Sequence, residues 1–423
     1  MRNMKESGID WIGKIPENWK IGKVKDIFIR KNEKANDEKP TVLSLARSGV
    51  KIRDISTGEG QLAESYNNYN PVEIGDLLLN PMDLYSGANC SVSKVKGVIS
   101  PAYINLRAKG KNNSTYYDYF FKTQYWGMVL FAHGKGVSFD NRWTLGLDTA
   151  LNYFIPVPKE TEQDKIAVFL DKRIYEIDNI IEKTKETIED YRRYKQSVIT
   201  ETVTKGLNKY IQFKESGIEW IGKIPKTWSV EKIKKVANLK TGTTPDTSKL
   251  EWFDNDYNWY TPGDFNEEII MENSNRKLSH KAIMENAATI IPANTTMIIG
   301  IGGTAGKIGF VNRECSCNQQ ITAIISNQVN NKYLMYWMIA NSKFLKETAM
   351  YTTLPIINNE TLGNYLFINP NSEKEEKEMV DFLNEKCEKI SNLIKEKEKS
   401  IEDLEKYKRS LIYEYVTGKK EIV

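Results

Sequence analysis

Two long segments of the chain, residues 161–205 and 374–418, are copies of each other. Shifting the first by 213 residues places Phe169 on Phe382. In both copies apolar residues recur at steps of three and four with charged residues between them, the heptad pattern of a coiled coil. At about 1.5 Å per residue each helix would be roughly 65 Å long, so neither can bury its apolar stripe alone. We therefore expect the two helices to pack on each other. The apolar positions are Leu170, Ile174, Ile177, Ile181, Ile188, Tyr191 and Val198 in the first copy and Leu383, Cys387, Ile390, Ile394, Ile401, Leu404 and Leu411 in the second.

A second repeat shows that the whole chain is duplicated. Residues 5–19 and 214–228 share the pattern Trp-Ile-Gly-Lys-Ile-Pro followed three residues later by Trp. A unit of about 210 residues is thus repeated in tandem, which predicts two domains and favours an antiparallel, pseudo-two-fold helix pair. We expect the repeated aromatic residues to pack as a clasp rather than to bind a ligand, because large aromatic side chains mostly serve packing. The predicted boundaries are 1–159 for the first body, 160–207 for its helix, 208–371 for the second body and 372–423 for its helix.

The segments before each long helix predict an α+β fold. Short apolar runs are separated by clusters of Gly, Asn, Ser and Pro, which is typical of strands and turns. One helix is expected in each body, over Ser114–Phe131 and Lys332–Glu347. The expected strands include residues 41–45, 76–79, 102–106, 289–301 and 321–325.

Composition excludes several classes of protein. The net charge of +4 is too small to indicate nucleic-acid binding by itself, so any basic surface must be local. No run approaches 18 apolar residues, and the first residues lack a signal-peptide core, so we expect a cytoplasmic protein. Cys315 and Cys317 have no second cysteine pair, and the chain holds only two histidines, so a zinc site is not expected.

Two motifs are similar to enzyme signatures but depart from them. Asn80-Pro81-Met82-Asp83 resembles the loop with which adenine methyltransferases hold a flipped base, but the stacking aromatic residue is missing. Gly300 to Lys307 is similar to nucleotide-binding glycine loops, yet the residues after Lys307 predict a strand where a helix should begin. We expect a hairpin turn there, whose bare backbone N–H groups can still approach a phosphate. No paired acid and base or nucleophile set is present, so the sequence predicts no active site.

Polar, basic and aromatic loops remain as candidates for function. Arg, Lys, Asn and Gln are the side chains that read base edges and phosphates, so a DNA-binding role is the hypothesis for these loops. Taken one at a time, each loop is more often a solvated turn. The candidate DNA-binding residues are Arg47, Lys51, Arg53, Tyr85, Asn89, Lys135, Ser138, Asn141 and Arg142 in the first body, and Lys240, Thr243, Thr244, Thr304, Lys307, Asn318, Gln319 and Gln320 in the second.

Over essentially its full length the chain resembles the specificity subunits of type I restriction-modification systems. The resemblance is carried by the repeated clasp, by the approach to the first helix from Ile155 to Gln163, and by the two long helices. Within the bodies, residues 97–103 and 301–307, the latter followed by Asn318-Gln319-Gln320, are similar to recurrent motifs of the family's recognition domains. The second copy departs where Glu375-Glu376 replaces Glu162-Gln163.

The resemblance implies a role in DNA recognition without catalysis. Each body would be a target recognition domain that reads one half of a split, asymmetric DNA sequence, with the helices as the spacer between them. Two methyltransferase subunits and two restriction subunits would complete the complex. S-adenosylmethionine, ATP and Mg²⁺ would then be bound by those partners, and this chain would bind no cofactor.

Two other hypotheses belong to different classes. A scaffold for protein–protein contacts would show no salt-dependent affinity for DNA, whereas phosphate contacts make that affinity fall steeply with salt. A self-sufficient DNA-modifying enzyme would need its own S-adenosylmethionine site. If a loop residue such as Arg142 reads a base, its removal should lower discrimination at one half-site by about 1–3 kcal/mol and leave the other half-site unchanged.

Overall fold

The structure is a computed structural model that describes residues 2–36, 40–56, 63, 65–82, 84–85, 89–137, 143–347, 350–351 and 355–422. The chain divides into two compact units: unit 1 is Met1–Thr184 with Lys399–Val423, and unit 2 is Lys185–Glu398. Helix α5 (Glu160–Lys205) starts in unit 1 and ends in unit 2, and helix α10 (Glu373–Val416) runs from unit 2 into unit 1. The two predicted long helices are thereby confirmed, and the limits of the two bodies stay a prediction.

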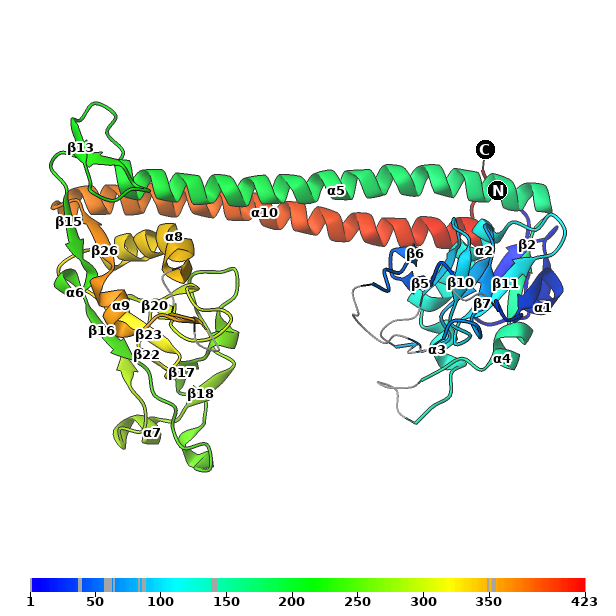
Figure 1. The fold of residues 1–423 in the computed structure, drawn as a ribbon, viewed down its shortest axis with the longest axis horizontal. Helices are drawn as coiled ribbons and strands as arrows, with labels where there is room; N and C mark the ends of the chain where they lie inside the picture. Colours follow the sequence, from blue (N-terminus) through cyan, green and yellow to red (C-terminus); the bar gives the residue numbers. More distant parts are fainter. Residues whose placement is uncertain are drawn as a thin grey trace. The chain divides into compact units, whose positions relative to one another are not determined.

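Contacts within each unit confirm that the two long helices are antiparallel (Figure 1). In unit 1 the rings of Phe169 and Tyr415 lie 4.5 Å apart, and between two and three turns further along α5 Asp178 accepts a hydrogen bond from Lys408, which precedes Tyr415. In unit 2 the Lys195 ammonium donates to the Ser391 hydroxyl at 2.8 Å. Residue numbers therefore increase along α5 in the direction in which they decrease along α10, so the two helices are antiparallel.

The heptad seam is buried over most of its predicted length. Leu170, Ile177 and Ile188 on α5 are all less than 10% exposed. Toward the end of α5 the buried position moves from the expected Val198 to its neighbour Ile199, which is 1% exposed. The shift has a simple cause, because a straight helix of 3.6 residues per turn drifts by about 20° per heptad.

The body of unit 1 is built from short antiparallel strands beside one main helix. Its central sheet has the order β4-β11-β8-β9, and α2 packs against strands β8 and β9 of that sheet. A separate strand pair, β3 with β12, joins the entry of the body to the start of α5. The strands are β1 Met4–Glu6, β2 Lys14–Pro16, β3 Lys20–Lys23, β4 Phe28–Lys31, β5 Leu43–Ala46, β6 Gly49–Ile52, β7 Asn70–Val72, β8 Leu77–Leu79, β9 Cys90–Val92, β10 Gly97–Ile99, β11 Ile104–Ala108 and β12 Phe154–Val157; the helices are α1 Val24–Ile27, α2 Ser114–Trp126, α3 Val129–Ala132 and α4 Leu147–Asn152.

The body of unit 2 repeats this plan, and its second sheet is larger than the corresponding β7–β10 pair of unit 1. The sheet β16-β23-β20-β21 is antiparallel and packs against α8, while β18-β17-β22-β19 contains one parallel pair, β17 with β22. The strands are β13 Phe213–Glu215, β14 Lys223–Pro225, β15 Ser229–Lys232, β16 Asn238–Thr241, β17 Tyr257–Tyr260, β18 Arg276–Leu278, β19 Ile290–Ile291, β20 Thr295–Ile299, β21 Ile308–Val311, β22 Cys315–Cys317, β23 Ile321–Ile325, β24 Met350–Tyr351, β25 Pro355–Ile356 and β26 Leu366–Asn369; the helices are α6 Ile233–Val236, η1 Leu250–Trp252, η2 Pro262–Asp264, α7 His280–Met284, α8 Asn331–Glu347 and α9 Asn359–Asn364.

The aromatic clasp packs in both units as the sequence predicts. Trp19 and Trp228 are fully buried. Each lies against the glycine that follows a long helix: Gly418 after α10 for Trp19, and Gly206 after α5 for Trp228. Both glycines have positive φ, 71° and 74°, a conformation that ends a helix at little cost when no Cβ is present.

Further contacts between body and helices occur once in each unit, and we call the whole set the shared frame. They join equivalent positions of the repeat, so the duplication is preserved in three dimensions as well as in sequence. The hydrogen bonds are Tyr116 Oη to the Val416 carbonyl (2.8 Å) and Tyr333 Oη to the Val203 carbonyl (3.2 Å), Tyr119 Oη to Asp171 (2.8 Å) and Tyr336 Oη to Asn384 (2.9 Å), and the Asn113 backbone N–H to Gln163 (2.8 Å) and the Asn330 backbone N–H to Glu376 (2.6 Å).

Two predicted elements differ in extent. The helix expected over Ser114–Phe131 is interrupted after Trp126, because Met128 adopts a left-handed conformation with φ 57°. The strand expected over residues 289–301 is split by a turn in which Asn294 also has positive φ, 55°. The turn from Gly300 to Lys307 joins two antiparallel strands, so the predicted hairpin is confirmed.

Candidate nucleic-acid interface

In unit 1 the predicted loops gather around the β5–β6 turn. Arg47 lies in this turn and is exposed, and Lys51 is exposed on β6. The Asn89 side chain donates to the Ala46 carbonyl at 2.6 Å, which ties residues near β9 to the turn. Asn89 therefore has a structural role in addition to its predicted one. Arg53 follows β6, where its backbone N–H donates to the Val42 carbonyl at 2.8 Å.

A second group in unit 1 surrounds an aromatic cluster. Tyr85 is 59% exposed, and its ring lies 6.1 Å from that of Phe131. Lys135 is exposed and forms a two-residue β-bridge with Thr144, so its backbone is fixed while its ammonium faces water. Exposed basic and aromatic side chains on a fixed backbone suit phosphate contact and base stacking. Ser138, Asn141 and Arg142 lie outside the described residues.

In unit 2 three predicted loops meet. Thr244 donates to the Gln319 side chain, and the Gln320 carbonyl accepts the backbone N–H of Gly300 at 2.7 Å. Gly242 lies so close to the β22–β23 turn that a Cβ would be 2.2 Å from the Cys317 carbonyl. The loop that follows β16, the β22–β23 turn and the Gly300–Lys307 turn thus form one continuous surface.

The predicted residues of this surface fall into two groups. Thr304 and Gln319 are exposed at its edge. Others take part in the structure: Asn318 is 7% exposed and bonds to Gln320, Thr243 bonds to Thr289, and the ammonium groups of Lys240 and Lys307 donate to the carbonyls of Ile290 and Phe265. Which of these side chains contact DNA stays a prediction.

An exposed arginine that the sequence reasoning missed lies beside the same surface. The Arg276 guanidinium stands over the rings of Phe253 and Trp259, 4.5 and 5.1 Å from their centroids. Trp259 in turn donates its indole N–H to the Thr243 carbonyl at 3.1 Å. A guanidinium held on two aromatic faces keeps its N–H edge available in a fixed direction, the geometry that reads guanine or phosphate. The aromatic run at 257–260 is the signal that could have found it.

The buried thiols of this region are chemically quiet. Burial raises the pKa of Cys315 well above its usual value and that of Cys317 to about 12, so both stay protonated at neutral pH. A protonated thiol is a poor nucleophile and a poor metal ligand. Across the part of the chain that the structure describes, no group of three or more His, Cys, Asp and Glu side chains is arranged to hold a metal ion. None of the described helices is both long and apolar enough to cross a bilayer.

Comparisons with known proteins agree with this architecture. Residues 225–403 match the family model of the type I restriction modification DNA specificity domain. The chain is 30% identical over 200 residues to the type I restriction enzyme MjaIX specificity subunit of Methanocaldococcus jannaschii, which covers 46% of this chain and 44% of that protein. It is 24% identical over 441 residues to the MjaVIII specificity subunit of the same organism, covering 96% and 94%.

A solved structure shares the fold. A chain described in a study of complex assembly and conformational transition of the type I R-M system superposes with a TM-score of 0.72 at 13% identity, covering 95% of this chain and 98% of that one. Two β-rich bodies on a pair of long antiparallel helices, with a DNA specificity domain in the second repeat, define the class as DNA-specificity proteins. The chain is similar to the specificity subunits of type I restriction-modification systems, and its second repeat matches their DNA specificity domain.

Proposed function

We propose that this chain is the DNA-reading subunit of a type I restriction-modification complex and that it recognises a bipartite, asymmetric DNA target. One body reads each half-site, through the loops around β5–β6 in unit 1 and through the Gly300–Lys307 surface in unit 2. The loops hold the candidate base and phosphate readers on fixed backbones, and base edges together with phosphates are what such side chains recognise.

The observation that carries this proposal is that the shared frame is duplicated whereas the loops are not. Tyr116 and Tyr333 hold their bodies to the long helices in the same way. In contrast, the equivalent connections, residues 80–89 between β8 and β9 and residues 300–307 between β20 and β21, differ in sequence and in length. Two bodies that have the shared frame in common but differ in their loops suit the recognition of two different DNA sequences. The target should therefore be asymmetric.

We further propose that the chain docks two methyltransferase subunits and, in the full complex, two restriction subunits. Each long helix exposes an apolar residue and a tyrosine at equivalent positions, Ile180 and Tyr194 on α5 and Leu393 and Tyr407 on α10, between 39% and 56% exposed. Repeated exposed apolar side chains favour two equivalent partners. The chain itself would be non-catalytic and cytoplasmic and would bind no cofactor, with S-adenosylmethionine, ATP and Mg²⁺ held by the partners.

The test is to co-express the chain with its methyltransferase subunit and to map N6-methyladenine across the genome by single-molecule sequencing. The expected result is a split motif of two unlike half-sites at a fixed gap, with one adenine methylated on each strand. An assembled complex that methylates nothing and binds duplex DNA with no dependence on salt would overturn the proposal and favour a protein scaffold.

A further inference from the structure

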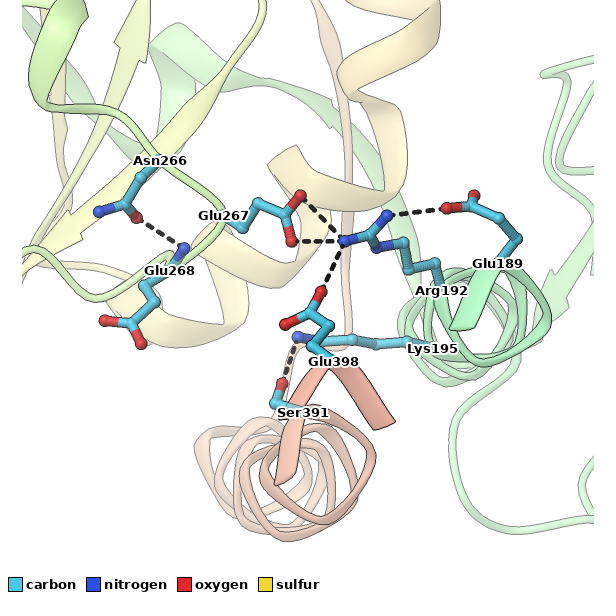
Figure 2. Close-up of polar contacts among 8 residues, drawn as sticks. All are labelled: Glu189, Arg192, Lys195, Asn266, Glu267, Glu268, Ser391 and Glu398. Atoms are coloured by element: carbon cyan, nitrogen blue, oxygen red, sulfur yellow. Dashed lines mark hydrogen bonds and ion pairs between the residues drawn. The ribbon is translucent and has the colours of Figure 1, made fainter. Parts of the chain in front are cut away.

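One guanidinium in unit 2 joins both long helices to the second body. Arg192 on α5 donates to both carboxylate oxygens of Glu267 at 2.8 and 3.0 Å (Figure 2). The same side chain pairs with Glu398 on α10 at 3.2 Å and with Glu189 on α5 at 2.7 Å. Three carboxylates from three segments therefore converge on a single planar cation, which constrains direction as well as distance.

Glu267 belongs to a loop that is fastened to the helices twice. We call residues 265–271 the bridging loop. Beside Glu267, the carboxylate of Glu268 accepts a hydrogen bond from Lys395 on α10 at 2.6 Å. Asn266, in turn, accepts the backbone N–H of Glu268, which fixes the turn that presents both acids (Figure 2). The loop is thus attached to both members of the helix pair.

The other side of the bridging loop is attached to the candidate reading surface. Lys307, at the end of the Gly300–Lys307 turn, donates its ammonium to the Phe265 carbonyl at 3.3 Å. Phe310 on β21 exchanges two backbone hydrogen bonds with the loop, donating to Ile269 at 2.7 Å and accepting from Met271 at 2.8 Å. The contact is close, since a Cβ on Gly309 would lie 2.3 Å from the Met271 sulfur.

The ion pairs contribute little to folding, because water screens exposed charges. The side chains of Arg192, Glu267 and Glu398 are 37%, 78% and 45% exposed, and pairs of this kind have small effects on stability. Their effect is on the direction in which the bridging loop is held against the helix pair. The bridging loop is one of the connections from the helix pair to the Gly300–Lys307 turn, and Arg192 lies at its helical end.

We propose that Arg192 and the bridging loop are positioning elements that set where the Gly300–Lys307 turn stands relative to the helix pair, and thereby which gap between the two half-sites is accepted. This inference rests on the proposed function. It is particular to unit 2, because the position equivalent to Arg192 in the second helix copy is Glu405, of opposite charge. Arg192 and the bridging loop would determine the accepted gap between the half-sites, and the loops would determine which bases are recognised.

The experiment uses the complex of this chain with its methyltransferase subunit. Transfer of labelled methyl groups is measured on duplexes that carry the mapped half-sites at the native gap and at gaps one base pair shorter and longer. The variants are Arg192→Gln, Glu267→Gln and the double variant, with Arg173→Gln as the matched control. Arg173 also pairs with a carboxylate on α5, Glu176 at 2.9 Å, but this pair lies within one helix.

The ratio of methylation at the native gap to that at the altered gaps should fall by about threefold to tenfold in each single variant. The double variant should lose no more than the stronger single one, since both remove the same contact. Arg173→Gln should keep the wild-type ratio.

Two results would overturn the inference: an unchanged ratio in both single variants, or an equal loss of methylation at all gaps, which a merely structural role would give. If the wild-type complex methylates no bipartite duplex, the proposed function itself fails, and this outcome is distinct from both.

Discussion

Unit 1 and unit 2 attach their bodies to the long helices through equivalent contacts, yet they build different surfaces on those bodies. Unit 1 presents the β5–β6 hairpin and an aromatic group around Phe131, whereas unit 2 presents the four-stranded sheet β18-β17-β22-β19. The frame contacts are buried and depend on shape, so they tolerate little change. The loops are exposed and free to vary. The comparison shows that attachment to the helices and the exposed loop surfaces are built from separate residues.

Removing the clasp tryptophans should give the largest effects. Trp19→Ala and Trp228→Ala should each lower the free energy of unfolding by about 3–5 kcal/mol, because a fully buried indole leaves a large cavity. Urea denaturation measures the loss, and hydrogen exchange should place it in unit 1 for Trp19 and in unit 2 for Trp228. Trp126→Ala, at a partly exposed position, is the control and should cost less. Loss of protection in both units from one substitution would contradict the separation of the two frames.

Substitution of the glycines that follow the two long helices should destabilise the two units by different amounts. Alanine at either position must hold positive φ, a strain of roughly 1–2 kcal/mol. Gly418→Ala should cost more than Gly206→Ala, since its Cβ would be 2.5 Å from Pro16 whereas that of residue 206 would be 3.2 Å from Trp228. Urea midpoints of the two variants give the order. A larger loss for Gly206→Ala would show that the C-terminal end of α10 adapts more easily than the structure implies.

Arg276 tests the surface that β17 and β18 form in unit 2. Arg276→Ala should lower discrimination at one base position of one half-site by about 1–3 kcal/mol, because the guanidinium held over Phe253 and Trp259 would no longer read its base. Competition binding with single-base variants of the target measures this. Lys277→Ala removes the same charge from the neighbouring residue and is the matched control. Equal weakening for every base would mean that Arg276 contacts phosphate.

The smallest effect concerns a carboxyl group at the start of α10. Burial raises the pKa of Glu376, although the Asn330 backbone N–H that it accepts acts in the opposite direction. A carboxyl whose pKa is raised by folding costs stability when it ionises, so stability should fall as pH rises through that pKa. Glu376→Gln should therefore stabilise unit 2 at neutral pH, as Gln163 occupies the equivalent place in unit 1.

Thermal unfolding from pH 4 to pH 8 measures this difference. The advantage of Glu376→Gln over the wild type should shrink as the pH falls, because the wild-type carboxyl becomes protonated. A variant that is less stable than the wild type at pH 7 would mean that the charge on Glu376 strengthens the bond to Asn330 by more than burial costs.

Sequence periodicity was sufficient for the long helices and for the clasp, and the reason is physical. The heptad stripe and the repeated tryptophans are local patterns whose burial is needed in any fold of this chain. The bounds of α5 and α10 agree to within two residues with the repeated segments 161–205 and 374–418. The expected helix of the first body ran past its end, although Gly127 at the C-cap of α2 is a local signal for a helix end. Met128 after it adopts positive φ.

The surface residues were harder to predict. Loop composition pointed to Thr244 and Gln319, which do meet, but it could not distinguish exposed side chains from those bonded into the loops, such as Asn318. The pair of Arg192 and Glu267 had no local signature, because the two residues are 75 positions apart and both are ordinary charges on exposed positions. Arg276 required knowledge of the pairing of β17 with β18, which aligns it with Trp259.

The division of the chain into units also has a consequence for synthesis. Unit 2 is continuous in sequence, but unit 1 needs Lys399–Val423 to cover Trp19 and to receive the hydroxyl of Tyr116. On a ribosome the first body therefore emerges long before its last helical turns, by roughly ten seconds or more at ordinary rates of elongation. During that interval the apolar core residues of the first body that share a cluster with Ile412 and Val416 lack these two native partners. The body made first is therefore the last to be completed.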